Sequence, residues 1–277
     1  MILVAVAVAA LLAVGGVVGV VVHDQQRADA SRQQALSDLS VAITNYDALD
    51  SVLRAAEPKV GQVMSALSTT KLADYGNLYT VVDQDVPKAE GPVVDDYLRL
   101  RRDLSSFKSV TAPIWVREAD SKAILLRLNA GIDGYPQAQS AAVELTYQYH
   151  FLSDIGLVFL DLNDPALNGS PGQAINNAAQ LRLTLSSIRG DMTATHVSPT
   201  FTAYVTNLAS LVADYGDFAT AFQNQDRAAT NSASRRLSTD LQKLLTFDWV
   251  SASHYVDGAF AAELKSFETD LAAVKGE

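Results

Sequence analysis

The chain has 277 residues, of which 48% are apolar, and a formal net charge of −10. This acidity argues against a nucleic-acid partner, because such a protein needs a basic surface that replaces the counterions of the phosphates. The sequence contains no cysteine, which excludes disulfides, thiolate metal sites and covalent haem attachment.

The first 22 residues contain no charged side chain, and we predict that they cross a membrane as a helix. At 1.5 Å per residue the run is about 33 Å long, which matches the roughly 30 Å hydrocarbon core of a bilayer. The alternative is a cleaved signal peptide, which needs a basic leader and a small-residue cleavage site just after a shorter apolar core. Nothing basic precedes Ile2, and the one plausible site, at 28–30, lies too far from Val22. These features favour an uncleaved anchor in the lipid bilayer over residues 1–22.

We expect residues 23–277 to form a polar domain outside the cytoplasm, because a large domain behind an N-terminal span is most often exported. The positive-inside rule does not decide the orientation, since Arg27 and Arg32 follow the span and only the α-amino group precedes it. The prediction is therefore a single-pass protein of the cell membrane with an extracytoplasmic C-terminal domain.

Within the span, Gly15 and Gly19 have the GxxxG spacing that lets two membrane helices approach closely. This pattern predicts a helix-packing face for a homodimer or a protein partner. The alternative is that glycine and alanine are simply common in membrane spans.

Beyond the span the sequence predicts an all-α protein. The longest stretch without glycine or proline covers 217–257, which no β-sandwich with short strands and frequent turns would tolerate. Apolar residues recur at alternating spacings of three and four, as in Phe201, Tyr204, Leu208 and Leu211, which is typical of coiled-coil-like seams in an elongated up-and-down helical bundle.

We assign eight helices to this domain and expect the first to continue the membrane span without a break. The last is expected to be broken near Asp248 or Gly258. The predicted helices cover 24–57, 59–85, 93–111, 114–133, 137–162, 172–195, 200–224 and 226–275.

A short internal echo suggests a duplication. Residues 73–80 (ADYGNLYT) match residues 213–220 (ADYGDFAT) at an offset of 140 residues. The echo predicts two tandem helical modules, 24–135 and 163–277. The alternative is a chance match between helices rich in alanine and leucine.

Two histidines have a carboxylate about one helical turn away: His150 with Asp154, and His254 with Asp257. Two such pairs on facing helices are a candidate site for a divalent metal in a bundle core. The alternative is an ordinary contact along each helix, and neither a Glu-x-x-His nor an HExxH motif is present. The sequence also lacks a GxSxG elbow and a P-loop, so we expect no cofactor and no enzymatic activity.

Residues 174–182 read AINNAAQLR. This segment resembles the helix opening, roughly A-I-N-x-A-x-x-L-R, of nitrate-sensor receptors and of type IV pilus chemoreceptor input domains. The resemblance implies a membrane-anchored helical bundle in which Arg182, together with Asn176, binds a planar anion, a role that suits a guanidinium fork. The chain departs from that pattern at Ala179, where the family has glycine, and it offers only one predicted span.

The sequence thus predicts a membrane-anchored, extracytoplasmic helical protein that binds or scaffolds a protein partner, or forms a homodimer, without catalysis. The alternative function is a ligand-sensing bundle of the chemoreceptor input type. A metal protein of the bundle-core type is the third.

Overall fold

The computed structural model describes residues 2–69, 81–109, 118–196 and 198–276. The side chains of residues 2–21 and 24, and of several residues at the ends of these segments, lie outside the description. The described chain is helical and contains no strand, so the predicted all-α fold is confirmed.

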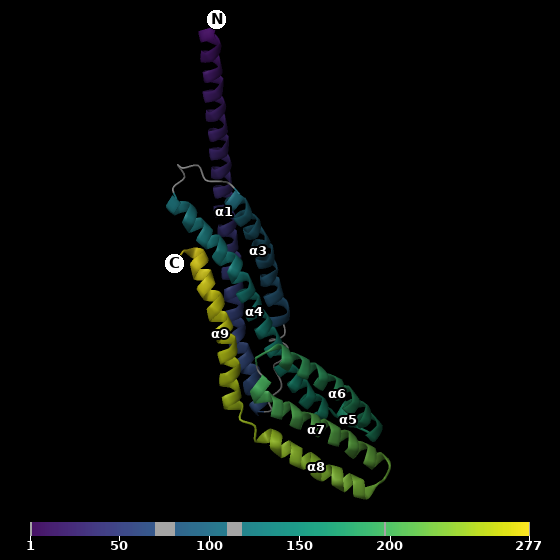
Figure 1. The fold of residues 1–277 in the computed structure, drawn as a ribbon. Helices are drawn as coiled ribbons and strands as arrows, with labels where there is room; N and C mark the ends of the chain where they lie inside the picture. The colour runs from purple at the N-terminus through teal and green to yellow at the C-terminus, as the bar shows by residue number, and fades with distance from the viewer. Residues whose placement is uncertain (1, 70–80, 110–117, 197, 277) are drawn as a thin grey trace. The chain divides into compact units, whose positions relative to one another are not determined.

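Figure 1 shows the helices of the described chain. They are α1 (Ile2–Thr69), the π-helix η1 (Val81–Asp85), α3 (Val86–Ser109), α4 (Glu118–Asn163), α5 (Pro165–Asn168), α6 (Pro171–Ala194), α7 (Ser198–Gln223), α8 (Arg227–Leu245) and α9 (Trp249–Lys275).

Three of the predicted helix boundaries are wrong. α1 runs through Pro58, α4 runs through Pro136, and the helix predicted to begin at residue 93 begins at Val86 and runs through Pro92. A proline inside a helix removes one backbone hydrogen bond and costs about 3 kcal/mol. Apolar burial on both sides of Pro58 offsets that cost, because Ala56 and Val60 are both buried.

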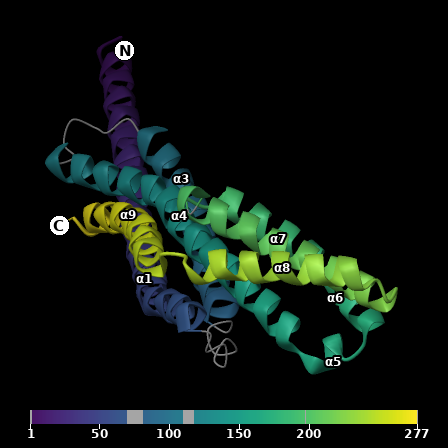
Figure 2. The same ribbon diagram turned by 90° about the horizontal axis from the view of Figure 1, so that it is seen from below.

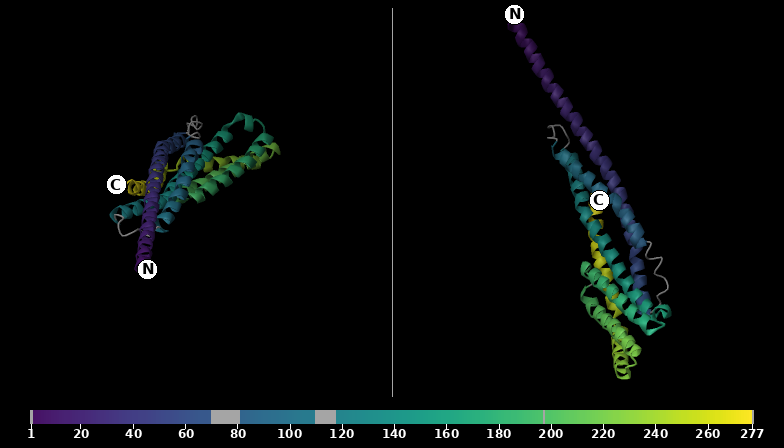
Figure 3. Two further views of the ribbon diagram at one scale, coloured as in Figure 1. Left: turned by 90° about the horizontal axis from the view of Figure 1, so that it is seen from above. Right: turned by 90° about the vertical axis from the view of Figure 1, so that its right-hand side faces the viewer.

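Two further expectations about the helices are confirmed. The right-hand view of Figure 3 shows α1 as one uninterrupted helix, which begins at Ile2 and ends at Thr69. The predicted break near Asp248 is also present, because α8 ends at Leu245 and α9 begins at Trp249.

The predicted membrane span falls on the part of α1 whose side chains are not described. Among the described residues, no helix combines the length and the apolar character needed to cross a membrane. Residues 1–22, with Gly15 and Gly19, lie almost wholly outside those residues. The transmembrane helix and its packing face therefore stay predictions.

The chain divides into two compact units that are interleaved in sequence. Unit 1 comprises Met1–Asp50, Lys88–Gln139 and Lys265–Glu277, and unit 2 comprises Ser51–Pro87 and Ser140–Leu264. These units do not coincide with the predicted modules 24–135 and 163–277. Residues 73–80 of the internal echo lie outside the described residues, so the duplication stays a prediction.

Unit 1 is organised around the fully buried Tyr46 of α1. Its hydroxyl donates a hydrogen bond of 2.6 Å to the carbonyl oxygen of Gly131 in α4, and its ring packs edge to face against Phe267 of α9. Burial raises the pKa of Tyr46 above its usual range, which keeps the hydroxyl protonated as a donor. Gly131 has no room for a side chain, because a Cβ would lie 2.6 Å from Cδ1 of Leu100 in α3.

In unit 2, α7 packs against both α6 and α8 and lies between them in Figure 1, and Figure 2 shows the same three helices from below. An aromatic cluster fastens the connection between α8 and α9 to the start of α7. The ring of Phe201, fully buried on α7, lies 4.9 Å from that of Phe151 and 5.4 Å from that of Phe247, measured between centroids. Tyr204 and Trp249 complete the cluster, with centroids 5.1 Å apart. Such edge-to-face and tilted contacts add about 0.5–1.5 kcal/mol per pair to the burial of the rings.

Replacing Gly131 with alanine is expected to destabilise the protein by about 1–3 kcal/mol, the usual cost of overpacking a filled core. The new Cβ would collide with Leu100, which is fully buried and has little freedom to move. Gly91→Ala in α3 of the same unit is the control, since nothing lies within 4 Å of its Cβ position. That change should stabilise by about 0.5–1 kcal/mol through helix propensity.

Thermal unfolding of the detergent-solubilised chain, followed by circular dichroism, measures both changes. Two shifts of the same sign and size would contradict the close approach at Gly131.

Candidate functional site

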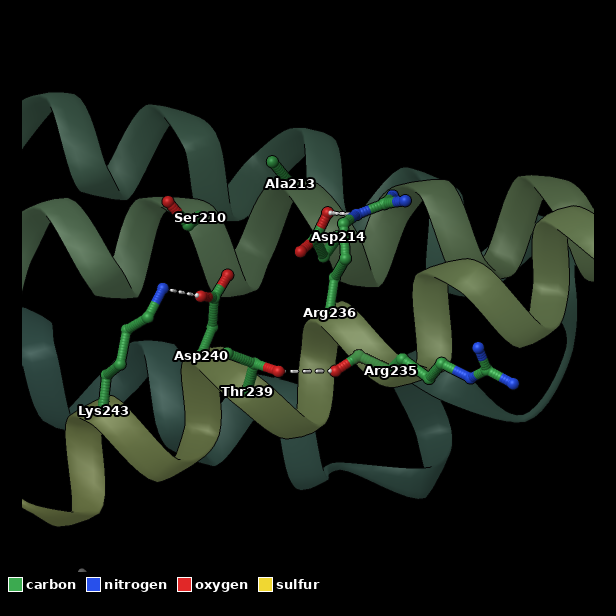
Figure 4. Close-up of a pocket in the computed structure, with 8 residues that line it drawn as sticks. All are labelled: Ser210, Ala213, Asp214, Arg235, Arg236, Thr239, Asp240 and Lys243. Carbon is green, nitrogen blue, oxygen red and sulfur yellow. Dashed lines mark hydrogen bonds and ion pairs between the residues drawn. The ribbon is translucent and has the colours of Figure 1, made fainter.

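A hollow of about 440 Å³ opens between α7 and α8 in unit 2 (Figure 4). It is lined mainly by polar and charged side chains, namely Ser210, Ala213, Asp214, Arg235, Arg236, Thr239, Asp240 and Lys243. The basic side chains come from α8, which contains four basic residues and one acidic residue, a net charge of +3. This helix is therefore a basic element in a chain whose net charge is −10.

Acidic partners hold two of the cations in the hollow. Arg236 donates from Nε to Asp214 at 2.6 Å and from Nη2 to Asp217 at 2.8 Å, so two carboxylates one turn apart on α7 clamp its guanidinium. The hydrogen bond to Asp214, followed by the two negative charges, raises the pKa of Arg236. Lys243 donates to the buried carboxylate of Asp240 at 2.7 Å. The pairs of Arg236 fasten α8 to α7, whereas Lys243 and Asp240 pair within α8. Together these pairs leave little cationic charge in the hollow for a ligand.

The Arg235 side chain differs from its neighbour. It is exposed, and within the described chain its guanidinium makes no hydrogen bond or ion pair. In Figure 4 it points away from Asp214 and Asp240. The hydroxyl of Thr239 donates only to the Arg235 backbone carbonyl, at 3.0 Å. Arg235 is thus available for an anionic group.

Apolar side chains lie exposed on the same helix. Leu241 is 42% exposed and Leu245 is 61% exposed, and their spacing of four places both on one face of α8. Arg227 shares that face, because it lies eighteen residues, or five turns, before Leu245. We call this set, Arg227, Arg235, Leu241 and Leu245, the α8 surface. The α8 surface combines exposed apolar side chains with arginines that are not held by carboxylates. Such a surface is suited to binding a partly apolar surface that carries carboxylates, and not to catalysing a reaction.

The structure surrounds one predicted metal ligand with carboxylates that the sequence analysis did not select. Nε2 of His150 lies 2.8 Å from Oδ1 of Asp83 in η1. Asp154 and Asp191 are close enough for the charge of His150 to lower their pKa values, although burial raises both overall. Asp83 and Asp191 are far from His150 in sequence, so helical spacing could not reveal them.

The second predicted pair lies elsewhere in unit 2. His254 is exposed at the start of α9, where it lines a separate hollow with Met64 and Trp249. Asp257 accepts a hydrogen bond from the hydroxyl of Ser253. Within the described part of the chain, no three histidine, aspartate or glutamate side chains are grouped to hold a metal ion. The predicted set of His150, Asp154, His254 and Asp257 therefore gains no support as a metal site, and we do not carry it further.

The asparagine that shapes the 174–182 segment is Asn177 rather than the predicted Asn176. Asn176 is exposed, whereas Asn177 is 6% exposed and donates to the carbonyl of Asp161 and to Oδ1 of Asn168. The amide nitrogen of Asn168 in turn donates to three carbonyls at the end of α4, and its Oδ1 also accepts a hydrogen bond from the Tyr215 hydroxyl. This network satisfies helix-end carbonyls that would otherwise lack partners.

Arg182, the predicted anion-binding residue, is exposed on α6 beside α7. A Cβ at Gly216 would lie 3.5 Å from its Nη2 and 3.2 Å from Cβ of Ala178, so this glycine permits close packing of the two helices. Arg182 could reach an anion from this position, and the anion site at Arg182 and Asn176 stays a prediction.

No protein-family model, curated protein or solved structure matches this chain. The arguments for function therefore rest on the geometry of the chain itself.

Two adjacent asparagines offer a matched test of the network in unit 2. Asn177→Ala should destabilise the protein by about 1–3 kcal/mol, because it leaves the buried carbonyl of Asp161 and Oδ1 of Asn168 each with one donor fewer. Asn176→Ala should change stability by less than about 0.5 kcal/mol, as is usual for exposed positions. Urea unfolding measures both, and an Asn176 effect equal to that of Asn177 would refute the assignment.

Proposed function

We propose that the chain is a single-pass, membrane-anchored helical protein that binds an acidic protein partner through the α8 surface, on the extracytoplasmic side and without catalysis. The observation that carries this proposal is the α8 surface itself: an unpaired arginine and exposed leucines on a basic helix of an acidic chain.

The charge distribution supports an acidic partner. The net charge of −10 repels acidic proteins, and among the described helices α8 has the largest net positive charge. Complementary charge speeds encounter and sets the orientation of docking more than it adds affinity. Because Arg235 has no hydrogen-bond or ion-pair partner among the described side chains, its pairing with a carboxylate would not break an ion pair seen in the structure.

The exposed leucines supply the apolar part of the contact. Burial of apolar surface contributes about 25 cal/mol per Å², and the centres of protein interfaces are depleted in charge. Leu241 and Leu245 fit such a centre, with Arg235 and Arg227 at its rim.

A second copy of the chain fits the α8 surface less well than a separate protein does. In a contact between two copies, α8 of one copy would bind an acidic surface elsewhere on the other, which is a head-to-tail arrangement. Such contacts generate open filaments unless their rotation closes a ring. We therefore commit to a different, acidic protein as the partner.

The anchor rests on the uncharged run of residues 1–22, which the helix α1 joins to the rest of the chain. The chain should remain in the membrane pellet after extraction with alkaline carbonate, because about 20 apolar residues hold a helix in the bilayer. Deleting residues 2–22 should release it. Recovery of the intact chain in the supernatant would contradict the anchor.

Photocrosslinking from position 245 in intact membranes tests the α8 surface. A photoreactive amino acid in place of Leu245 should trap an acidic protein, and Arg235→Glu should reduce the adduct by about tenfold, the equivalent of 1.4 kcal/mol. Raising the salt concentration should weaken trapping in parallel.

The matched control is Arg189→Glu, which makes the same charge change at an exposed position of α6. It should leave the adduct unchanged. An adduct of two copies of this chain, or one that is insensitive to Arg235→Glu, would overturn the proposal.

A further inference from the structure

The connection between α4 and α6 contains a chemically labile pair of residues. Asn168, the last residue of α5, is followed by Gly169, and this is the one Asn-Gly pair in the sequence. Asparagine is a labile residue, because the backbone nitrogen of the next residue can attack its side-chain amide carbon. A glycine in that next position leaves the nitrogen unshielded, since glycine has no Cβ.

The structure favours glycine at this place. Gly169 follows α5 with φ −68° and ψ −14°, and a Cβ there would lie 3.0 Å from the carbonyl oxygen of Pro165. It would also lie 3.5 Å from Oε1 of Gln173. Close packing of the backbone therefore places the residue that most favours this attack directly after Asn168.

Hydrogen bonds hold the Asn168 carboxamide at both its nitrogen and its oxygen. The nitrogen donates to three backbone carbonyls at or just after the end of α4, at 2.8–3.1 Å. The oxygen accepts from Nδ2 of Asn177 in α6 at 2.9 Å and from the Tyr215 hydroxyl of α7. Attack at the amide carbon makes that carbon tetrahedral, which displaces both atoms from these hydrogen bonds. The network therefore opposes the reaction as long as it is intact.

We propose that Asn168-Gly169 is a self-modification site, which the hydrogen-bond network protects and which local opening of the network exposes. The site goes beyond the proposed partner binding and is independent of it, because none of these residues belongs to α8.

The reaction needs only water as a co-reactant. The Gly169 nitrogen forms a bond to Cγ of Asn168, the bond between Cγ and Nδ2 breaks, and ammonia leaves with the proton of the Gly169 amide. Water then opens the cyclic imide at one of its two carbon–nitrogen bonds, which leaves aspartate or isoaspartate at position 168. The net change is the hydrolysis of the side-chain amide to a carboxyl group.

The modified chain could not restore the network. A carboxylate has no hydrogen-bond donor, so one of its oxygens would face the three carbonyls that the amide nitrogen of Asn168 contacts. Isoaspartate also adds a methylene group to the main chain before Gly169. Each opening that leads to reaction is therefore permanent, and modified chains accumulate with time.

Peptide mapping of the full chain in detergent, by mass spectrometry, tests the protection. The chain is incubated at neutral pH either folded or in urea, and the converted fraction at Asn168 is followed over time. Conversion should be at least about tenfold slower in the folded chain, because only the opened network reacts. Equal rates in the two states would overturn the proposal.

Two variants test the network itself. Tyr215→Phe and Asn177→Ala each remove one donor to Oδ1 of Asn168. Each should speed conversion in the folded chain by about tenfold, the equivalent of about 1.4 kcal/mol for one hydrogen bond. Asn176→Ala, at the exposed neighbouring position, is the matched control and should leave the rate unchanged.

Asn231 separates local opening from global unfolding. It is exposed on α8, outside the network, and the same peptide map reports its conversion. Its rate should not change in Tyr215→Phe or Asn177→Ala. Equal acceleration at Asn168 and Asn231, or no acceleration at Asn168 in either variant, would overturn the proposal.

Discussion

The backbone of α4 at Gly131 lies so close to Leu100 of α3 that an added Cβ would come within 2.6 Å of Leu100 Cδ1. The Gly131 carbonyl accepts the hydrogen bond of the Tyr46 hydroxyl, and Tyr46 is fully buried. A buried phenol without an acceptor would cost about 1–3 kcal/mol. The absence of a Cβ at Gly131 thus permits the close packing of α4 against α3. The ring of Phe267 in α9 packs edge to face against the ring of Tyr46.

Carboxyl groups in both units are partly buried, whereas the basic residues of α8 are not. Several carboxyl groups lie partly buried between helices, and burial raises the pKa values of Asp96, Asp154, Asp191 and Asp270. A carboxyl group with a raised pKa binds its proton more tightly in the folded chain than in the unfolded chain. These groups therefore favour the folded state at mildly acidic pH more than at neutral pH. α8 differs from this pattern, since Arg236 pairs with carboxylates of α7, Lys243 pairs with Asp240 of α8 itself, and Arg235 lies at the surface.

The helices could be predicted from the sequence because their apolar spacing is regular, whereas the three boundaries that were placed at Pro58, Pro92 and Pro136 could not. The break before α9 was predictable, since Asp248 accepts a hydrogen bond from the backbone N–H of Ser251 in the first turn, as N-cap residues do. Pro58 and Pro136 misled the prediction because tertiary burial outweighs the local cost of proline. The candidate site was harder to predict from the sequence than the helices. Arg235 and Arg236 are adjacent, and only the position of α7 shows which of them is clamped.

Interleaving of the two units sets the order in which the chain can complete its core. Unit 1 needs both Tyr46 and Phe267, which are 221 residues apart, and every residue of unit 2 lies between them in the sequence. Contacts of such long range are slow to form. During synthesis, the apolar N-terminal run, which we propose inserts into a membrane, emerges long before Phe267. The C-terminal part of α9, which contains Phe267, is then the last segment that unit 1 needs to complete its core.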